Sequence, residues 1–158
     1  MAAETKREVA AATIRAFREA DAGAVGALAQ EASELANWTE ENYRESLSWQ
    51  GIVALVREDE GKVRGFIIGR QVADEGEIYN LAVGAASRRR GEGGTLLKAA
   101  MEEFRARGVG RVFLDVRESN AAGIAFYEKH GFSKTGRRAG YYRDPEEAAI
   151  VMEMKLTG

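Results

Sequence analysis

Hydrophobic and polar positions along the chain follow two periods, one typical of strands and the other of helices. Runs rich in apolar, β-branched and aromatic residues, which favour strands, occupy residues 12–17, 51–72 (two runs), 76–83, 111–118 and 148–156. A turn signal at 59–62, Asp-Glu-Gly-Lys, divides 51–72 and predicts a hairpin. The run 111–118 alternates strictly, which puts Leu114 on one face of its strand and Asp115 on the other.

Four other segments repeat their apolar residues at the spacing of an amphipathic helix. Their predicted boundaries are Asp21 to Ala32, Thr39 to Leu47, Gly93 to Gly108, and Ser119 or Asn120 to Gly131. Most of the starting side chains can accept hydrogen bonds from amides of the first helical turn. The two closing glycines favour the left-handed backbone that ends a helix.

With one further strand counted between the last helix and 148–156, the order of elements is strand, two helices, three strands, helix, strand, helix and two strands. It predicts an α/β fold with a mixed, largely antiparallel sheet that is flanked by helices on both faces. A parallel step is expected where strand, helix and strand follow one another. The chain has 158 residues, of which 45% are hydrophobic. We therefore expect one domain over 1–158, with 1–11 as a loosely ordered extension.

Composition and charge exclude several functional classes. The 23 Lys and Arg residues are balanced by 25 Asp and Glu residues, and the net charge of -2 gives no general attraction to nucleic acid or anionic lipid. Without cysteine, the chain has no disulfide, thiolate metal site or acyl-cysteine intermediate, and no metal is expected. No apolar run has the length of a signal-peptide core or a membrane span, so we expect a cytoplasmic protein.

Arginine and glycine are concentrated in residues 87–94, between the strand that ends at Val83 and the next helix. The first amide groups of a helix have no intrahelical acceptor and lie at the positive end of its dipole. Glycines let a phosphate approach the backbone, and arginines add charge. The P-loop and dinucleotide patterns do not fit, because Gly94 is followed by Thr95 and Leu96 stands where a third glycine is needed. The stretch predicts an anion site, with a solvated basic loop as the alternative.

Two motifs carry a family resemblance. The pattern Arg-x-x-Gly-x-Gly at 88–93 and the block LDVRESNAAGIAFYEKHGF at 114–132 resemble the two signatures of the GNAT superfamily of N-acetyltransferases. Within it, the chain is most similar to the bacterial ribosomal-protein alanine N-acetyltransferases, which share SNAAxIxxYExxGF and a late tyrosine pair, here Tyr141 and Tyr142. The resemblance is dense over 77–154. It implies a GNAT-like fold and an acetyl-CoA-dependent N-acetyltransferase.

The resemblance also implies where acetyl-CoA binds as co-substrate. Main-chain groups of Leu81, Ala82 and Val83 would pair with the pantetheine amides. Asn120 would bond the cofactor arm, with a plain helix cap as its alternative role. The residues that would surround the pyrophosphate are Arg88, Arg89, Arg90, Gly91, Glu92, Gly93, Gly94 and Thr95.

Three side chains are candidates for proton transfer. By resemblance, Tyr127 is the acid that protonates the leaving thiolate, with packing on the inner helix face as its alternative role. A carboxylate must take the amine proton, because the lone His130 lies at a helix end that suits a cation better than a base. The related branch usually has glutamate at Asp115, so Glu77 on the cleft strand is the competing base. A solvated strand-face charge is the alternative for either, and for Asp115 also pairing with Arg117.

The implied reaction is direct attack of a primary amine in a ternary complex. The favoured acceptor is the N-terminal α-amine of a protein such as a ribosomal protein, with Tyr141 and Tyr142 as substrate-binding residues. An α-amine has a pKa near ~7.8 against ~10.4 for lysine, so it demands less of the base. A small-molecule amine, a non-catalytic CoA-binding domain and RNA binding through the loop arginines with Arg137 and Arg138 are the alternatives. The oligomeric state is left open.

Overall fold

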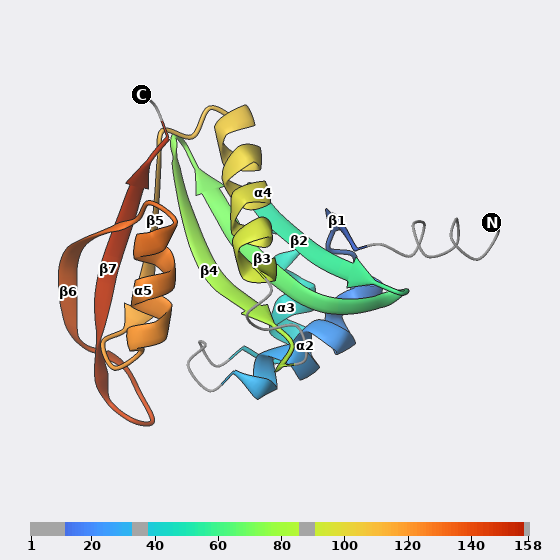
Figure 1. Cartoon of the computed structure of the whole chain (residues 1–158), viewed down its shortest axis with the longest axis horizontal. Helices are drawn as coiled ribbons and strands as arrows, with labels where there is room; N and C mark the ends of the chain where they lie inside the picture. Colours follow the sequence, from blue (N-terminus) through green and yellow to red (C-terminus); the bar gives the residue numbers. More distant parts are fainter. Residues whose placement is uncertain (1–11, 33–37, 86–90, 157–158) are drawn as a thin grey trace.

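The computed structural model of the chain describes residues 12–32, 38–85 and 91–156 (Figure 1). The predicted N-terminal extension at 1–11 and the three arginines at 88–90 lie outside these residues. No helix in the described part of the chain combines the length and the apolar character needed to cross a membrane.

Within the described residues, one sheet of seven strands forms the centre of the fold, in the order β1-β2-β3-β4-β5-β7-β6. Its strands are β1 (Thr13–Ala16), β2 (Ile52–Asp59), β3 (Lys62–Val72), β4 (Glu75–Val83), β5 (Arg111–Arg117), β6 (Ser133–Tyr142) and β7 (Glu147–Lys155). All neighbouring strands are antiparallel apart from β4 and β5. The mixed, largely antiparallel sheet is therefore confirmed, and its parallel step lies between β4 and β5.

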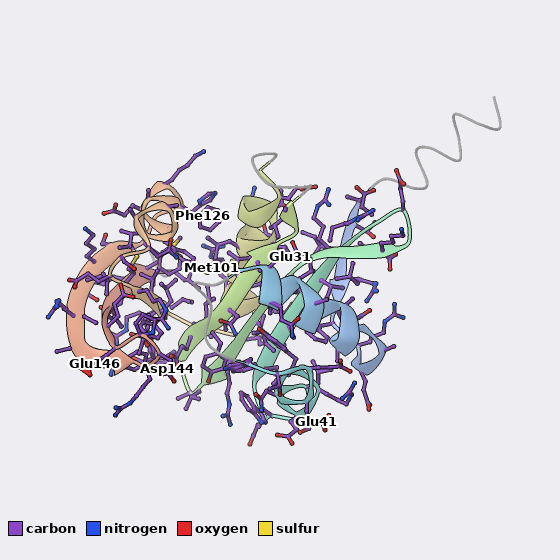
Figure 2. The ribbon with its side chains drawn as sticks, turned by 90° about the horizontal axis from the view of Figure 1, so that it is seen from below. Glu31, Glu41, Met101, Phe126, Asp144 and Glu146 are labelled. Atoms are coloured by element: carbon purple, nitrogen blue, oxygen red, sulfur yellow. The ribbon has the colours of Figure 1, made fainter. Side chains whose placement is uncertain are left out.

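Helices cover both faces of this sheet, as predicted. They are α2 (Ala22–Glu31), α3 (Glu40–Ser46), α4 (Glu92–Ala106) and α5 (Ala121–Lys129), with a 3-10 turn at Glu19–Asp21 before α2. Figure 2 shows Met101 of α4 and Phe126 of α5 on one side of the sheet and Glu41 of α3 on the other. Each side has its own hydrophobic core, one centred on Phe104 under α4 and the other on Phe66 under α2 and α3.

Most predicted helix boundaries are confirmed by their capping contacts. The Thr39 hydroxyl accepts a hydrogen bond from the Asn42 amide at 3.1 Å, and the Asn120 side chain accepts one from the Gly123 amide at 2.9 Å. Gly108 has φ +84° where α4 ends, a left-handed conformation that residues with a Cβ rarely adopt. Local side-chain chemistry thus fixes where these helices begin and end.

Asp21 differs from its predicted role as the cap of α2. Its buried carboxylate binds Arg15 at 2.8 Å and accepts a hydrogen bond from the Arg18 amide. These contacts close the 3-10 turn before α2, and the side chain makes no hydrogen bond with the first turn of α2 itself. A buried carboxylate is stabilised more by a guanidinium than by amide groups alone.

β4 and β5 separate halfway along their length, and this separation creates the site. Their pairing runs only to Ile78 opposite Leu114, although both strands continue beyond these residues. On the other edge of β4, Ile68 pairs with Asn80 and Gly69 with Ile78, which leaves Tyr79 as an extra, bulged residue. A bulge bends its strand and increases the local twist, so the second half of β4 turns away from β5.

The bulge also changes which way β4 side chains face. The Asn80 amide donates a hydrogen bond to the Tyr43 hydroxyl of α3 at 3.1 Å, and the Tyr79 ring lies 5.7 Å from Trp38 and 6.0 Å from Trp49. Two successive residues therefore face the α3 side. After them the alternation resumes, with Leu81 packed against the α4 side.

Candidate active site

A pocket of about 230 Å³ lies where β4 and β5 separate. Its walls come from both strands, the start of α4, the inner face of α5 and the end of β6. The lining residues are Ile78, Tyr79, Asn80, Leu81, Ala82, Val83, Gly93, Leu114, Asp115, Val116, Asn120, Gly123, Phe126, Tyr127 and Tyr142. Eight of them belong to the set that the sequence singled out: Leu81, Ala82, Val83, Gly93, Asp115, Asn120, Tyr127 and Tyr142.

The β4 wall of the pocket is a strand edge. Leu81 and Ala82 pair with Ile67 and Phe66 of β3 on one side. β5 pairs with β4 no further than Ile78, so the opposite edge of β4 at Leu81 and Ala82 lines the pocket instead. This edge fits a ligand whose amides alternate donors and acceptors in the manner of an added strand.

The start of α4 forms the second wall. Gly91 precedes the helix in the left-handed conformation, with φ +76°. Gly93 faces the pocket, and a Cβ at this position would lie 3.5 Å from the Phe126 ring and 3.6 Å from the Val83 side chain. The missing side chain keeps the helix N-terminus, with its amide donors and positive dipole, open to an anion in the pocket.

Two predicted loop residues use their side chains within the protein. The buried Glu92 binds Arg57 of β2 at 2.6 Å and so anchors the start of α4 to the sheet. The Thr95 hydroxyl donates to the Glu92 carbonyl at 2.8 Å and does not line the pocket. The Thr95 amide also donates to the Gly91 carbonyl at 3.1 Å, so both side chains and this amide are already engaged within the protein.

Gly94 faces α5 instead of the pocket. A Cβ there would come within 2.7 Å of His130 Nε2. The His130 ring lies tilted against the Phe126 ring, with centroids 4.5 Å apart, and its Nδ1 lies 2.8 Å from the Phe126 carbonyl, to which it donates. The histidine therefore joins α5 to α4, in line with the structural role that the sequence favoured.

Tyr127 extends from α5 into the pocket at the separation of the strands. Its ring packs on Phe126 at 5.2 Å and Phe132 at 5.6 Å. Burial raises the pKa of the Tyr127 phenol above its ordinary value, and the nearby Tyr142 adds to this shift. The phenol is thus a protonated hydrogen-bond donor at neutral pH, both packed and open to the pocket.

Asp115 extends from β5 on the face opposite Leu114, as the alternation predicted. Its side chain is 9% exposed, and Arg138 Nε lies 3.3 Å from its Oδ1. This contact lacks hydrogen-bond geometry, so the buried Oδ1 accepts no hydrogen bond within the described structure. The alternative pairing with Arg117 is wrong, because Arg117 binds Glu147 at 3.2 Å.

Glu77 lies beside Asp115 on the neighbouring strand, outside the pocket lining. Its register partner is Phe113 of β5, two residues before Asp115. Burial raises the pKa of Glu77, the Asp115 charge raises it further, and Arg138 opposes the shift. The two predicted bases are therefore electrostatically coupled, and only Asp115 contacts the pocket.

The two late tyrosines occupy different environments. Tyr142 lines the pocket beneath the Arg117 guanidinium, which lies 4.4 Å from its ring centre, and burial raises its pKa to about 12. Tyr141 is 48% exposed and lies under the Arg138 guanidinium at 5.7 Å. Tyr142 therefore belongs to the pocket, and Tyr141 lies with Arg138 outside its lining.

Sequence reasoning assigned no site role to Gly123 and considered Arg138 only for RNA. A Cβ at Gly123 would lie 2.5 Å from the Asn120 amide nitrogen, so this glycine makes room for the Asn120 side chain. Arg138 is 23 residues from Asp115 in sequence, and no local pattern links them. The only sequence feature that could have marked Arg138 as a site residue is its position shortly before the tyrosine pair.

Comparison with known proteins identifies the class. Residues 22–132 match the acetyltransferase (GNAT) family. The chain belongs to this family and is an N-acetyltransferase.

Several individual members of this family are similar to the chain in sequence and structure. The chain is 40% identical over 99 residues to the [ribosomal protein bS18]-alanine N-acetyltransferase of Escherichia coli strain K12, covering 61% of this chain and 67% of that protein. A crystal structure of the Escherichia coli ribosomal-protein-S18-alanine N-acetyltransferase superposes with a TM-score of 0.84 and 32% identity over 93% of this chain and 95% of that one. Ard1 from Thermoplasma volcanium gives a TM-score of 0.84 and 31% identity over 94% and 99%. The predicted fold is thus confirmed.

Proposed function

We propose that the chain transfers the acetyl group of acetyl-CoA to the N-terminal α-amine of a protein, with an alanine-initiated ribosomal protein as the acceptor. The observation that carries this proposal is the joint placement of Tyr127 and Asp115 in one pocket. A hydrogen-bond donor and a carboxylate there face a strand edge and a helix N-terminus that suit the donor substrate. The names of the relatives support the choice of acceptor.

The residues of the pocket fit acetyl-CoA. The edge of Leu81, Ala82 and Val83 would pair with the pantetheine amides, and the Asn120 amide NH₂ would donate to the same arm. The pyrophosphate would lie at the start of α4, next to Gly93 and the main chain of the loop. The arginines at 88–90 stay predictions as its charged partners.

Tyr127 would act as the general acid. The amine nitrogen attacks the acetyl carbon, a C–N bond forms, and the C–S bond breaks as the tetrahedral intermediate collapses. Tyr127 donates its phenolic proton to the departing sulfur. Its raised pKa keeps this proton in place until the sulfur carries negative charge.

Asp115 would take the proton of the attacking amine, directly or through water. It lines the pocket, whereas Glu77 lies behind it and acts mainly through its charge. The short side chain suffices because an α-amine, with a pKa near ~7.8, is far more often neutral than a lysine at ~10.4. This difference favours an N-terminal amine over a lysine side chain.

Acetylation of a peptide panel tests the proposal. Alanine-initiated peptides, peptides with a blocked N-terminus and an internal lysine, and free polyamines or amino acids are offered with acetyl-CoA and analysed by mass spectrometry. We expect acetylation at the α-amine of the alanine-initiated peptides. Preferred acetylation of a free amine would assign a small-molecule acceptor, and CoA binding without thiol release would indicate a non-catalytic domain.

A further inference from the structure

A charged group lies beside the pocket, on the sheet face that α4 and α5 do not cover. Glu77 of β4 and Asp115 of β5 supply two carboxylates, while Arg138 and Tyr141 of β6 supply a cation and an aromatic ring. Asp115 is linked to Arg138 by their ion pair, and its charge acts on Glu77 and on Tyr141. Three strands thus contribute to one cluster.

An irregularity in β6 brings Arg138 and Tyr141, the two cluster residues on this strand, close together. Arg138 pairs with Ala149 of β7 and Tyr142 with Glu147, so β6 advances from 138 to 142 while β7 advances only from 149 to 147. Gly140, within this bulge, has φ +60°. The extra residues place the Arg138 guanidinium over Tyr141, where the side chain also reaches across β7 to Asp115.

The ion pair between Arg138 and Asp115 is longer and less directed than the neighbouring ion pair between Arg137 and Glu118. Arg137 binds both oxygens of Glu118 through directed hydrogen bonds of 2.7 and 3.0 Å. Arg138 approaches Asp115 at 3.3 Å without such geometry, and its side chain is 52% exposed against 9% for Asp115. A cation held by charge alone at the edge of solvent is easily displaced.

The buried carboxylate nevertheless needs a cation. Glu77 and Asp115 lie on adjacent strands, and their mutual repulsion contributes to the raised pKa of Glu77. Within residues 12–32, 38–85 and 91–156, Asp115 forms an ion pair only with Arg138. The nearby Arg70 donates instead to the Gln50 carbonyl. An uncompensated buried charge is costly, so removal of Arg138 leaves a site that favours another cation.

We propose that Arg138 is a displaceable placeholder for the ammonium group of the acceptor. In the free enzyme its guanidinium neutralises Asp115. When the acceptor arrives, the guanidinium moves into solvent, and the α-ammonium takes its place between the free Asp115 Oδ1 and the Tyr141 ring, where a cation–π contact adds to the charge attraction. The identity of this ammonium rests on the proposed function. Arg138 is therefore a residue that sets acceptor affinity and takes no part in the chemistry.

Binding of an alanine-initiated peptide to the CoA-saturated enzyme tests the placeholder, because no acetyl group is transferred in this complex. By calorimetry, Arg138→Gln should bind the peptide about 3- to 10-fold more tightly than the parent, and Arg138→Lys should resemble the parent. Arg137→Gln is the matched control and should change nothing. The same peptide with an acetylated N-terminus should bind Arg138→Gln and the parent equally.

The role of Asp115 in this competition is tested by a double variant. In an Asp115→Asn background, Arg138→Gln should give no gain, because the carboxylate for which the two cations compete is gone. Weaker or unchanged peptide binding by Arg138→Gln alone would overturn the proposal. So would an equal gain for the acetylated peptide.

A measurement on the parent protein covers the case in which a variant fails to fold. The ¹⁵N signal of Arg138 Nε should shift on addition of the free-amine peptide, while that of Arg137 stays in place; an unchanged Arg138 signal at saturation would refute displacement. Thiol release from acetyl-CoA, measured in parallel, reports on the proposed function. Ammonium-dependent displacement without thiol release would sustain the placeholder and reject the acetyltransfer to this peptide.

Discussion

The two sides of the pocket, the cofactor side and the acceptor side, differ in the kinds of groups that form them. The side that fits acetyl-CoA consists of main chain and absent side chains, with the edge of Leu81 and Ala82 and the bare Gly93 held by the hydrophobic core beneath α4. The side that would receive the acceptor consists of charged side chains, with Arg138 of the exposed edge strand β6 reaching across β7 to Asp115. The first side depends on the fold itself. The second can be changed by single substitutions without loss of the fold.

Tyr127 lies between these two sides, and its removal should have the largest effect. Tyr127→Phe keeps the ring that packs on Phe126 and Phe132, so acetyl-CoA affinity and melting temperature should stay near those of the parent. Turnover should fall by about 10²- to 10⁴-fold. The lower end is expected because a thiolate is already a fair leaving group near neutral pH. Normal turnover with a large loss of stability would show that Tyr127 serves only the core.

Substitution of the two carboxylates on the acceptor side should lower kcat by different amounts. Asp115→Asn should lower kcat by about 10²-fold, because Asp115 contacts the pocket, and Glu77→Gln should have a smaller effect. Steady-state kinetics with an alanine-initiated peptide measure both. The reverse ranking would make Glu77 the base. Equal, small losses would mean that the amine arrives neutral and that the protein mainly positions it.

The cofactor side should respond to side-chain volume at the start of α4. Gly93→Val directs methyl groups into the space between Phe126 and Val83 and should weaken acetyl-CoA binding by at least about tenfold, or ~1.4 kcal/mol. Thr95→Val is the control, since its hydroxyl bonds within α4, and should leave the affinity nearly unchanged. Calorimetry on folded variants checks both. Equal affinity of the Gly93 variant and the parent would remove this loop as the site.

The same contrast explains what the sequence could predict. Helices and strands followed from apolar spacing, and the glycines and Asn120 marked the cofactor side because their roles are local. The Tyr79 bulge and the β6 irregularity depend on the register between strands, which hydrophobic alternation does not specify. The pairing of Asp115 with Arg138 depends on both strands and on β7 between them. The family resemblance could therefore indicate residues of the acceptor side, but the sequence could not predict that Asp115 and Arg138 lie together.

The smallest expected effect is on stability, and it reports whether the acceptor-side carboxylates repel each other. The pKa of Glu77 is raised in the folded protein, first by burial and then by Asp115. A carboxyl with a raised folded-state pKa stabilises the fold fully below its unfolded pKa of about 4.3 and loses this contribution as pH rises through the folded value. Ionised Glu77 should thus cost stability at neutral pH.

Glu77→Gln should melt slightly higher than the parent at pH 7, and this gain should shrink as the pH is lowered towards 4. Thermal unfolding at both pH values checks this. A lower melting temperature for the variant at pH 7 would mean that Glu77 is held by attractive contacts, and that Arg138 neutralises both carboxylates instead of Asp115 alone.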